Sequence, residues 1–416
     1  MLTPGDIVAL AIDKPAAGGR MIARVEGQVV LVAGTIPGER VTARIERVSK
    51  SVAYAQTIAV DDPSPDRRPT TTDPECGGAL YSHIAYARQL AVKRDVIVDA
   101  FTRIGRVTLP SPPVVRPSRE DGYRMRARLH VRGRRIGFFR EATHDLCDVR
   151  PTQQLLPATC DVVERLTATL RSLGVDAVRD VELSENVDGS ERAIALDADA
   201  PIDARVVERL AATEGVTGLV SRAGVHGRPQ VTDRIDLGGP VLALQRHVLA
   251  FFQGNRYLLR DLVAHVVSQL HDGAAIDLYA GVGLFAVAAA AARGVIVTAV
   301  EGDRYAAADL DANAAGVRGV IAVHQSVETF VRRVRLEPER PGTVIVDPPR
   351  TGMSRDALDG AIAIGAPRVV YVSCDVATLA RDARRLVDAG YAVTRVDAFD
   401  LFPNTPHVET IVVFDR

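Results

Sequence analysis

The chain has 416 residues, which is enough for two or three domains with buried cores. Lys and Arg together number 51 and Asp and Glu 52, so the net charge of -1 excludes a protein that coats nucleic acid with positive charge over its whole surface. Three lysines among the 51 basic residues leave 48 arginines. Coding bias is the first explanation of this excess, and arginine side chains that grip phosphates or carboxylates are the second.

Four cysteines are too few for a disulfide scaffold. The N-terminus lacks the basic start and apolar run of a signal peptide. The longest uncharged stretch, residues 278–292, has 15 residues, and a membrane span needs about 20. We therefore expect a cytoplasmic protein without a membrane partner.

Residues 1–60 alternate apolar and polar side chains between glycine turns, which predicts five short strands in a small β-barrel of the oligonucleotide-binding type. Residues 61–75 are rich in proline and hold no large apolar side chain, so they predict a linker. Helical spacing of Ile, Leu and Val predicts a helix over 82–104, and four prolines interrupt the pattern at 107–118.

Residues 123–150 predict two or three strands, because YRMRARLHV alternates strictly before a glycine turn. Residues 151–250 mix strands with helices at 159–173 and 204–214. From about residue 250, short apolar strands alternate with helices, a pattern typical of a parallel sheet covered on both faces. We therefore expect an α/β fold in three domains. They are a β-barrel (1–60), a linker with a central α+β domain (61–245) and a Rossmann-like domain (246–416).

Two glycines follow the first strand of this alternation, in the segment DLYAGVG. Gly281 and Gly283 let the backbone approach a ligand at the carboxyl end of the sheet, but the third glycine of the dinucleotide fingerprint is missing. Glu301 ends the next strand, where an acidic side chain accepts hydrogen bonds from a ribose. These features fit both NAD and S-adenosylmethionine (SAM).

The turn VDPPR ends another strand, so the acidic group of Asp347 faces the same crevice. In enzymes that methylate exocyclic amines, an aromatic residue usually follows the two prolines and stacks on the base. Here Arg350 follows them, which argues against amine methylation.

Cys374 lies where a strand ends and a helix begins, and helix N-terminal amides favour a thiolate. A lone cysteine is usually a small buried residue, but its place between Ser373 and Asp375 at the functional edge of the sheet favours a nucleophile. Glu409 begins the last strand, just after His407. An isolated strand glutamate is normally solvated, and only its partners make it a candidate general base.

Six segments, in this order, resemble the RNA uracil-5-methyltransferase family. They are FFQGN (251–255), DLYAGVG (277–283), AVEGD (299–303), VDPPRTGM (346–353), YVSCDVATLARD (371–382) and FPNTPHVETIVVF (402–414). The N-terminal barrel resembles the small RNA-binding TRAM domain that precedes many such enzymes, and residues 76–105 are similar to the family's joining segment. The resemblance spans nearly the whole chain and implies a C-terminal class I methyltransferase domain.

The resemblance implies that Cys374 adds to C6 of uracil, C5 takes a methyl group from SAM, and Glu409 removes the C5 proton so that the thiolate is expelled. The target base then has to leave the stack. The residues that the resemblance places around SAM are Gln253, Tyr279, Gly281, Gly283, Glu301 and Asp347. The implied protein is a monomer whose partner is structured RNA, ribosomal rather than transfer RNA, and not DNA.

Many relatives that act on large-subunit ribosomal RNA bind an iron–sulfur cluster through four cysteines, with a CGGC segment near the start. Here Cys76-Gly-Gly is followed by Ala79, and the later family position falls near Thr152. Cys147 and Cys160 do not have the matching spacing. Since a cluster normally needs four ligands, we predict that the chain binds neither a cluster nor another metal.

Nine arginines lie between residues 116 and 140 against two acidic residues, a local net charge of +7. Within this segment Arg124, Arg126 and Arg128 alternate along a predicted strand and so share one face. A solvated strand face is one interpretation. The family resemblance favours the other, a track that binds the RNA backbone.

Two other functions stay open. RNA cytosine C5-methyltransferases also use a cysteine and SAM, but they usually place the nucleophile after a proline, and this chain has no Pro-Cys pair. A non-catalytic RNA-binding or RNA-folding protein on the same scaffold is the other class, and the presence of both Cys374 and Glu409 argues against it.

Overall fold

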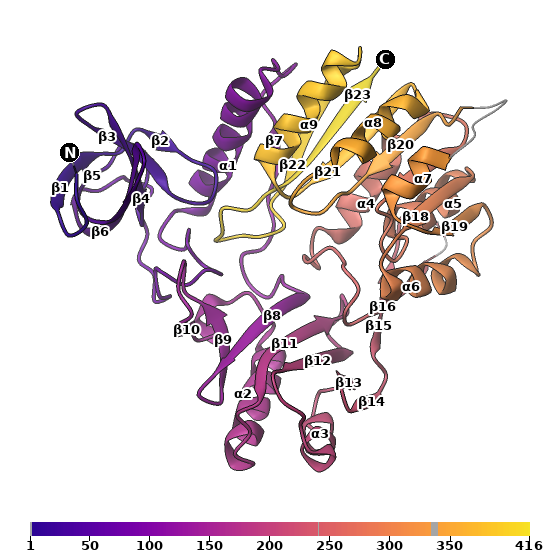
Figure 1. The fold of residues 1–416 in the computed structure, drawn as a ribbon, viewed down its shortest axis with the longest axis horizontal. Helices are drawn as coiled ribbons and strands as arrows, with labels where there is room; N and C mark the ends of the chain where they lie inside the picture. The colour runs from indigo at the N-terminus through magenta and orange to yellow at the C-terminus, as the bar shows by residue number, and fades with distance from the viewer. Residues whose placement is uncertain (1, 240, 334–339) are drawn as a thin grey trace.

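The computed structural model describes residues 2–239, 241–333 and 340–416. Figure 1 shows a β domain at the N-terminus, a central sheet flanked by helices, and a larger α/β unit that ends at the C-terminus. The predicted α/β class with a small N-terminal β domain is confirmed. No helix within the described ranges is long and apolar enough to cross a membrane.

The N-terminal domain is a six-stranded sheet in the order β1-β5-β6-β4-β3-β2. Its strands are β1 (Ile7–Ala11), β2 (Lys14–Pro15), β3 (Met21–Val25), β4 (Gln28–Ala33), β5 (Arg40–Ser49) and β6 (Val52–Asp62). Val30, Ala43 and Ala53 are fully buried in its core. The prediction of five strands was one too few, because the two residues of β2 carry no alternating pattern.

Helix α1 (Tyr86–Ala100) joins the N-terminal domain to the rest of the chain and ends in a π-helical turn, Phe101–Gly105. The proline-rich segment that follows was predicted only to break the helix. It also contains β7 (Val114–Arg116), which pairs in parallel with β22 at the edge of the C-terminal sheet. A three-residue edge strand between prolines has no periodic signal, and edge strands tolerate neighbouring prolines.

The central part is built on a seven-stranded sheet in the order β10-β9-β8-β11-β12-β13-β14. The strands are β8 (Arg126–Arg132), β9 (Arg135–Phe139), β10 (Leu146–Cys147), β11 (Val178–Glu185), β12 (Arg192–Ala198), β13 (Gly218–Ser221) and β14 (Gly224–Gly227). Helices α2 (Pro157–Ser172) and α3 (Ala204–Ala211) each bury one face against this sheet. Their bounds lie close to the two helices predicted at 159–173 and 204–214. A hairpin of β15 (Gln230–Ile235) and β16 (Leu242–His247) then leads into the last part.

Cys76 and Cys147, both buried, form a disulfide across 71 residues of sequence. Beside it, Cys76 makes an isolated β-bridge with Arg140, and the N–H of Gly77 donates to the Phe139 carbonyl at 3.0 Å. The bond therefore ties the segment after the linker to the edge of the central sheet. The sequence spacing did not predict this pairing, because the sheet brings together residues that are far apart in the chain.

The C-terminal part is an eight-stranded sheet in the order β19-β18-β17-β20-β21-β23-β22-β7. Its strands are β17 (Ala275–Leu278), β18 (Val297–Glu301), β19 (Val320–His324), β20 (Thr343–Val346), β21 (Arg368–Ser373), β22 (Ala392–Phe399) and β23 (Glu409–Asp415). The prediction of a parallel sheet is confirmed for β17 to β21, whereas β23 runs antiparallel to both β21 and β22.

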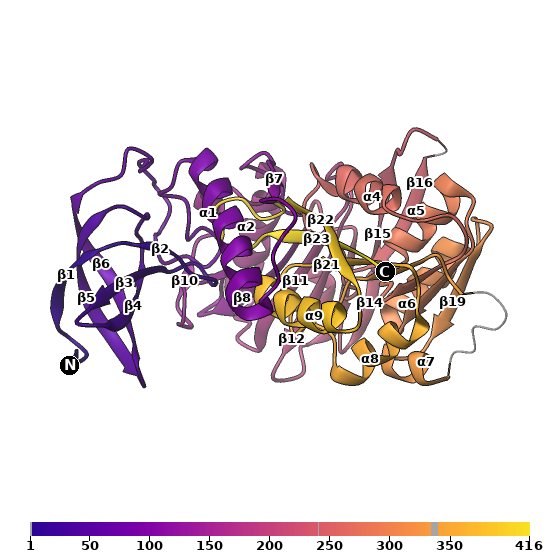
Figure 2. The same ribbon diagram turned by 90° about the horizontal axis from the view of Figure 1, so that it is seen from above.

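Helices cover both faces of this sheet, as the continuous apolar strands predicted (Figure 2). One face packs against α4 (Leu259–Ser268), α5 (Leu284–Arg293) and α6 (Arg304–Ala314), and the other against α7 (Val327–Arg333), α8 (Arg355–Ile364), α9 (Val376–Asp388) and the end of α1. The strand order reverses at β17, which lies between β18 and β20. Ligands of such sheets bind at this switch point, outside the carboxyl ends of the strands.

The domain boundaries at residues 60 and 245 stay predictions. Helix α1 and strand β7 both lie inside 61–245, and both pack on the C-terminal sheet. The polypeptide that enters the central domain has therefore first contributed to the C-terminal one.

Candidate active site

The loop between β17 and α5 lies at the switch point of the sheet, and its backbone turns sharply. Tyr279, Gly281 and Gly283 have φ angles of 63°, 56° and 90°. A Cβ atom at Gly283 would lie 2.7 Å from the side chain of Leu310, so that side chain would have to move. The positive φ angles of Gly281 and Gly283 favour glycine at both positions.

Glu301 orients this loop from the end of β18. Its carboxylate accepts hydrogen bonds from the backbone N–H of Gly281 at 2.8 Å and from that of Asp303 at 2.7 Å. The predicted contact between Glu301 and a ribose is not tested by this arrangement and stays a prediction. What the structure adds is that the carboxylate also holds the glycine loop against the neighbouring strand.

Two carboxyl groups lie at the ends of neighbouring strands beside this loop, that of Asp277 in β17 and that of the half-buried Asp347 directly after β20. Asp277 is fully buried, and in the part of the chain that the structure describes neither of its carboxyl oxygens has a hydrogen-bond partner. Asp347 accepts a hydrogen bond from Gln253 Nε2 at 3.0 Å. Burial, and then the charge of Asp347, raise the pKa of Asp277 well above its usual value. Burial raises the pKa of Asp347 to about 7.

Cys374 lies between the end of β21 and the start of α9, as the sequence predicted. Asp375 caps the helix by accepting a hydrogen bond from the Thr378 N–H at 2.8 Å. The expectation that the helix end favours a thiolate stays a prediction, and burial acts against it. Burial, followed by the charge of Glu409, raises the pKa of Cys374 to about 12, and the positive charge of Arg350 only partly opposes the rise.

The strand register brings Cys374 and Glu409 together. Ser373 of β21 pairs with Thr410 of the antiparallel β23, so the next residue on one strand faces the preceding residue on the other. Glu409 is 2% exposed. Burial and the charge of Asp347 raise its pKa well above the usual value.

Arg350 is the positively charged residue that acts on both Cys374 and Glu409, whereas its place in the sequence argued only against amine methylation. Its positive charge lowers the pKa of both Cys374 and Glu409. In the sequence, the feature that could have identified Arg350 as a site residue is its place directly after the DPP turn. His407 lies near Arg350 as well, and burial together with that charge lowers its pKa to about 4, so the ring is neutral at pH 7.

The three arginines predicted to bind RNA differ in environment. Arg124 precedes β8 and donates to Gln154 Oε1 at 2.6 Å, while Arg128 is 58% exposed and pairs with Asp180 at 2.5 Å. Arg126 is largely enclosed, and among the described residues its Nε has no hydrogen-bond partner. Burial lowers its pKa to about 10, so it stays charged at neutral pH.

Comparisons with known proteins place these features in a family. The family model described as tRNA (Uracil-5-)-methyltransferase matches residues 223–416, and the TRAM domain model matches residues 2–58. Two proteins named 23S rRNA (uracil(1939)-C(5))-methyltransferase RlmD are similar over nearly their whole length. The one from Pseudomonas entomophila is 31% identical over 98% of this chain and 93% of its own, and the one from Methylococcus capsulatus is 30% identical over 99% and 98%.

A crystal structure of Pyrococcus abyssi tRNA (uracil-54, C5)-methyltransferase, in complex with S-adenosyl-L-homocysteine, has the same fold. It matches 97% of this chain and 99% of its own with a TM-score of 0.78 at 23% identity.

The sheet order and the glycine loop define a class I methyltransferase fold with a TRAM domain in front of it. Because relatives at 30–31% identity cover almost all of the chain, the protein belongs to the SAM-dependent RNA (uracil-5-)-methyltransferase family.

Opposite substitutions in the charged cluster are expected to move the reactivity of Cys374 in opposite directions. Arg350→Met removes a group that lowers the pKa of the thiol, so alkylation by iodoacetamide at a fixed alkaline pH slows severalfold. Glu409→Gln removes a charge that raises this pKa, so alkylation speeds up. Cys374→Ala supplies the blank. Equal rates in the two variants would contradict the electrostatic coupling.

Proposed function

We propose that the protein methylates C5 of a uridine in structured ribosomal RNA through a covalent adduct between Cys374 and C6 of the base. The observation that carries the proposal is the pairing of Ser373 with Thr410, because it places a thiol and a carboxylate side by side at the ligand edge of the sheet. A nucleophile and a base at adjacent strand ends are what addition to C6 and proton removal from C5 require.

The chemistry needs both groups because C5 of uracil is too weak a nucleophile by itself. The Cys374 sulfur forms a bond to C6, and the electron pair of the C5–C6 double bond moves to make C5 nucleophilic. After C5 is methylated, Glu409 takes the C5 proton. That electron pair restores the double bond while the C6–S bond breaks and the thiolate leaves.

SAM, when bound, supplies the electrophilic methyl group. The residues fit such a cation, because the buried Asp277 and the half-buried Asp347 bring two carboxyl groups to the switch point, and Asp277 lacks a hydrogen-bond partner among the described residues. A positive ligand beside them lowers their pKa, and by the same sign that of Cys374. The remaining residues that would surround SAM are Gln253, Tyr279, Gly281, Gly283 and Glu301.

The substrate proposal rests on the whole-chain relatives, which are named for 23S ribosomal RNA. The match to the transfer-RNA enzyme from Pyrococcus abyssi is at 23% identity and bears on the fold alone. We therefore put ribosomal RNA before transfer RNA as the partner, with the enclosed cation of Arg126 close to the exposed ring of Phe251 as one contact point.

The proposal includes no iron–sulfur cluster. The Cys76–Cys147 bond supports this, since it occupies the first thiol of the segment that is CGGC in cluster-binding relatives. Residue 79 of that segment is alanine in this chain. A cluster would need ligands at both places.

Protein purified without oxygen is therefore expected to contain no iron and to show no absorbance band near 400 nm. Unfolded without reductant, it should react with a thiol reagent at two cysteines, Cys160 and Cys374. Cys147→Ser is the control, since it frees Cys76 and raises the thiol count by one. Stoichiometric iron in the native protein would contradict the prediction.

The mechanism predicts a trapped complex on RNA that contains 5-fluorouridine. The base cannot remove fluorine from C5 as it removes a proton, so the C6–S bond persists on a denaturing gel. With SAM present, we expect the adduct on 23S ribosomal RNA and not on transfer RNA. Cys374→Ala should abolish it, and Cys160→Ser, which removes a buried cysteine elsewhere, should not.

An adduct on transfer RNA alone would move the substrate to transfer RNA. The absence of an adduct on any RNA would favour a non-catalytic RNA-binding protein on the same scaffold.

RNA binding is expected to weaken in Arg126→Glu and to depend less steeply on salt, because one contact with a phosphate is lost. Arg179→Glu is the matched control, since Arg179 is exposed on the same central sheet and lies outside the predicted track. Titrations of labelled RNA at several salt concentrations measure both quantities. An unchanged slope in Arg126→Glu would remove Arg126 from the RNA-binding residues.

A further inference from the structure

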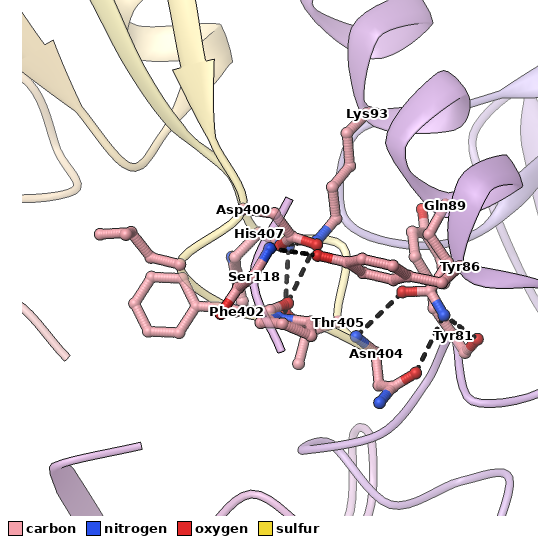
Figure 3. Close-up of polar contacts among 12 residues, drawn as sticks. Tyr81, Tyr86, Gln89, Lys93, Ser118, Asp400, Phe402, Asn404, Thr405 and His407 are labelled. Carbon is pink, nitrogen blue, oxygen red and sulfur yellow. Dashed lines mark hydrogen bonds and ion pairs between the residues drawn. The ribbon is translucent and has the colours of Figure 1, made fainter. Parts of the chain in front are cut away.

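One face of helix α1 carries three polar side chains that point at the connection between β22 and β23 (Figure 3). Tyr86, Gln89 and Lys93 are spaced so that they lie on the same side of the helix. Gln89 and Lys93 are 0% and 1% exposed. Buried polar groups are costly unless they are paired, so their partners show what this face of the helix is for.

Lys93 forms a fully buried ion pair with the first residue of the connection. Its Nζ lies 2.5 Å from Asp400 Oδ1 and donates to the Phe402 carbonyl at 3.1 Å. Burial lowers the pKa of Lys93, and the charge of Asp400 opposes that change. The backbone N–H of Asp400 also donates to the backbone carbonyl of Arg116 in β7 at 2.9 Å. The start of the connection is therefore held from two sides.

Gln89 holds the middle of the same connection. Its Nε2 donates to Asn404 Oδ1 at 2.9 Å, and its Oε1 accepts from the backbone N–H of Asn404 at 2.9 Å. Asn404 has a φ of 62°, a conformation that few residues adopt. The N–H of Tyr81, just before α1, donates to the Asn404 carbonyl at 2.8 Å. These three hydrogen bonds fix the turn in one shape.

The connection ends on Glu409. Phe399, the residue before Asp400, pairs directly with Glu409 across β22 and β23. A displacement of Asp400 therefore also displaces Glu409, because only the Phe399–Glu409 pair lies between them. An apolar pair of similar size in place of Lys93 and Asp400 would be about as stable as the buried ions, so the ion pair adds geometry more than stability.

We infer that Lys93 and Asp400 are positioning residues for Glu409, so that helix α1 sets where the base stands when it removes the C5 proton. This inference rests on the proposed function. In the step concerned, the C5–H bond breaks, the proton goes to the Glu409 carboxylate, and the electron pair forms the C5–C6 double bond as the C6–S bond breaks. Misplacement of the base slows this step and leaves the earlier attack by Cys374 intact.

The test compares Lys93→Met with the wild type on ordinary uridine RNA in the presence of SAM. The turnover rate is expected to fall about tenfold or more, as for a displaced catalytic base, while the KM for RNA changes little. A covalent protein–RNA complex should accumulate on a denaturing gel, because methylated base stays bonded to Cys374. The double variant Lys93→Met/Asp400→Leu leaves no unpaired buried charge and should show the same accumulation.

Asp99→Asn is the matched control. Asp99 lies on the same helix and pairs with Lys14 at 2.7 Å, but this pair is partly exposed and does not contact the connection. It should turn over like the wild type. Accumulation of the complex in Asp99→Asn, wild-type turnover in both Lys93 variants, or slow turnover without a persistent complex would each overturn the inference.

RNA with 5-fluorouridine separates this inference from the proposed function. The wild type and Lys93→Met should trap it equally, since proton removal plays no part in that complex. If the wild type traps nothing, the proposed function fails. If only Lys93→Met traps nothing, the lysine acts in the attack or in folding, and the positioning role fails.

Discussion

The antiparallel insertion of β23 between β21 and β22 is the constraint on which the candidate site depends. In a parallel sheet the carboxyl ends of all strands lie along one edge, and their amino ends lie along the opposite edge. Because β23 runs the other way, its first residue, Glu409, reaches the ligand edge opposite Cys374, the residue that directly follows β21. Glu409 meets Cys374 for this reason, and the loop that precedes Glu409 has to be held in place at the same edge.

Burial dominates the electrostatics of that edge. Asp277, Asp347, Glu409 and Cys374 all have raised pKa values, and burial is the largest cause for each of them. Arg350 is the cation that opposes the shift at Cys374 and Glu409. A site of this kind favours the arrival of positive charge, which is the sign that a sulfonium carries. A positively charged ligand would thus lower the pKa of the carboxyl groups and of the Cys374 thiol by the same electrostatic effect.

The segment from the linker to β7 connects the parts of the molecule. The Cys76–Cys147 disulfide bonds its start to the central sheet, and α1 contacts the β22–β23 connection through the Lys93–Asp400 ion pair. Strand β7 pairs with β22 at the edge of the C-terminal sheet. The N-terminal β domain is therefore joined to the rest through a segment that also supports the proposed base. The contact between Gln89 of this segment and Asn404 of the β22–β23 connection joins residues that are 315 positions apart in the sequence.

Local patterns in the sequence determined the α/β class, the alternating strands of the β domain, the glycine loop and the place of Cys374 between a strand and a helix. Each of these depends on side-chain period or on residues a few positions apart. Tertiary structure decided what depends on distant partners: the edge strand β7, the Cys76–Cys147 bond, the role of Arg350 and the buried pair of Lys93 with Asp400. It also decided that burial raises the pKa of Cys374, because a pKa reflects burial and neighbouring charges that no local pattern contains.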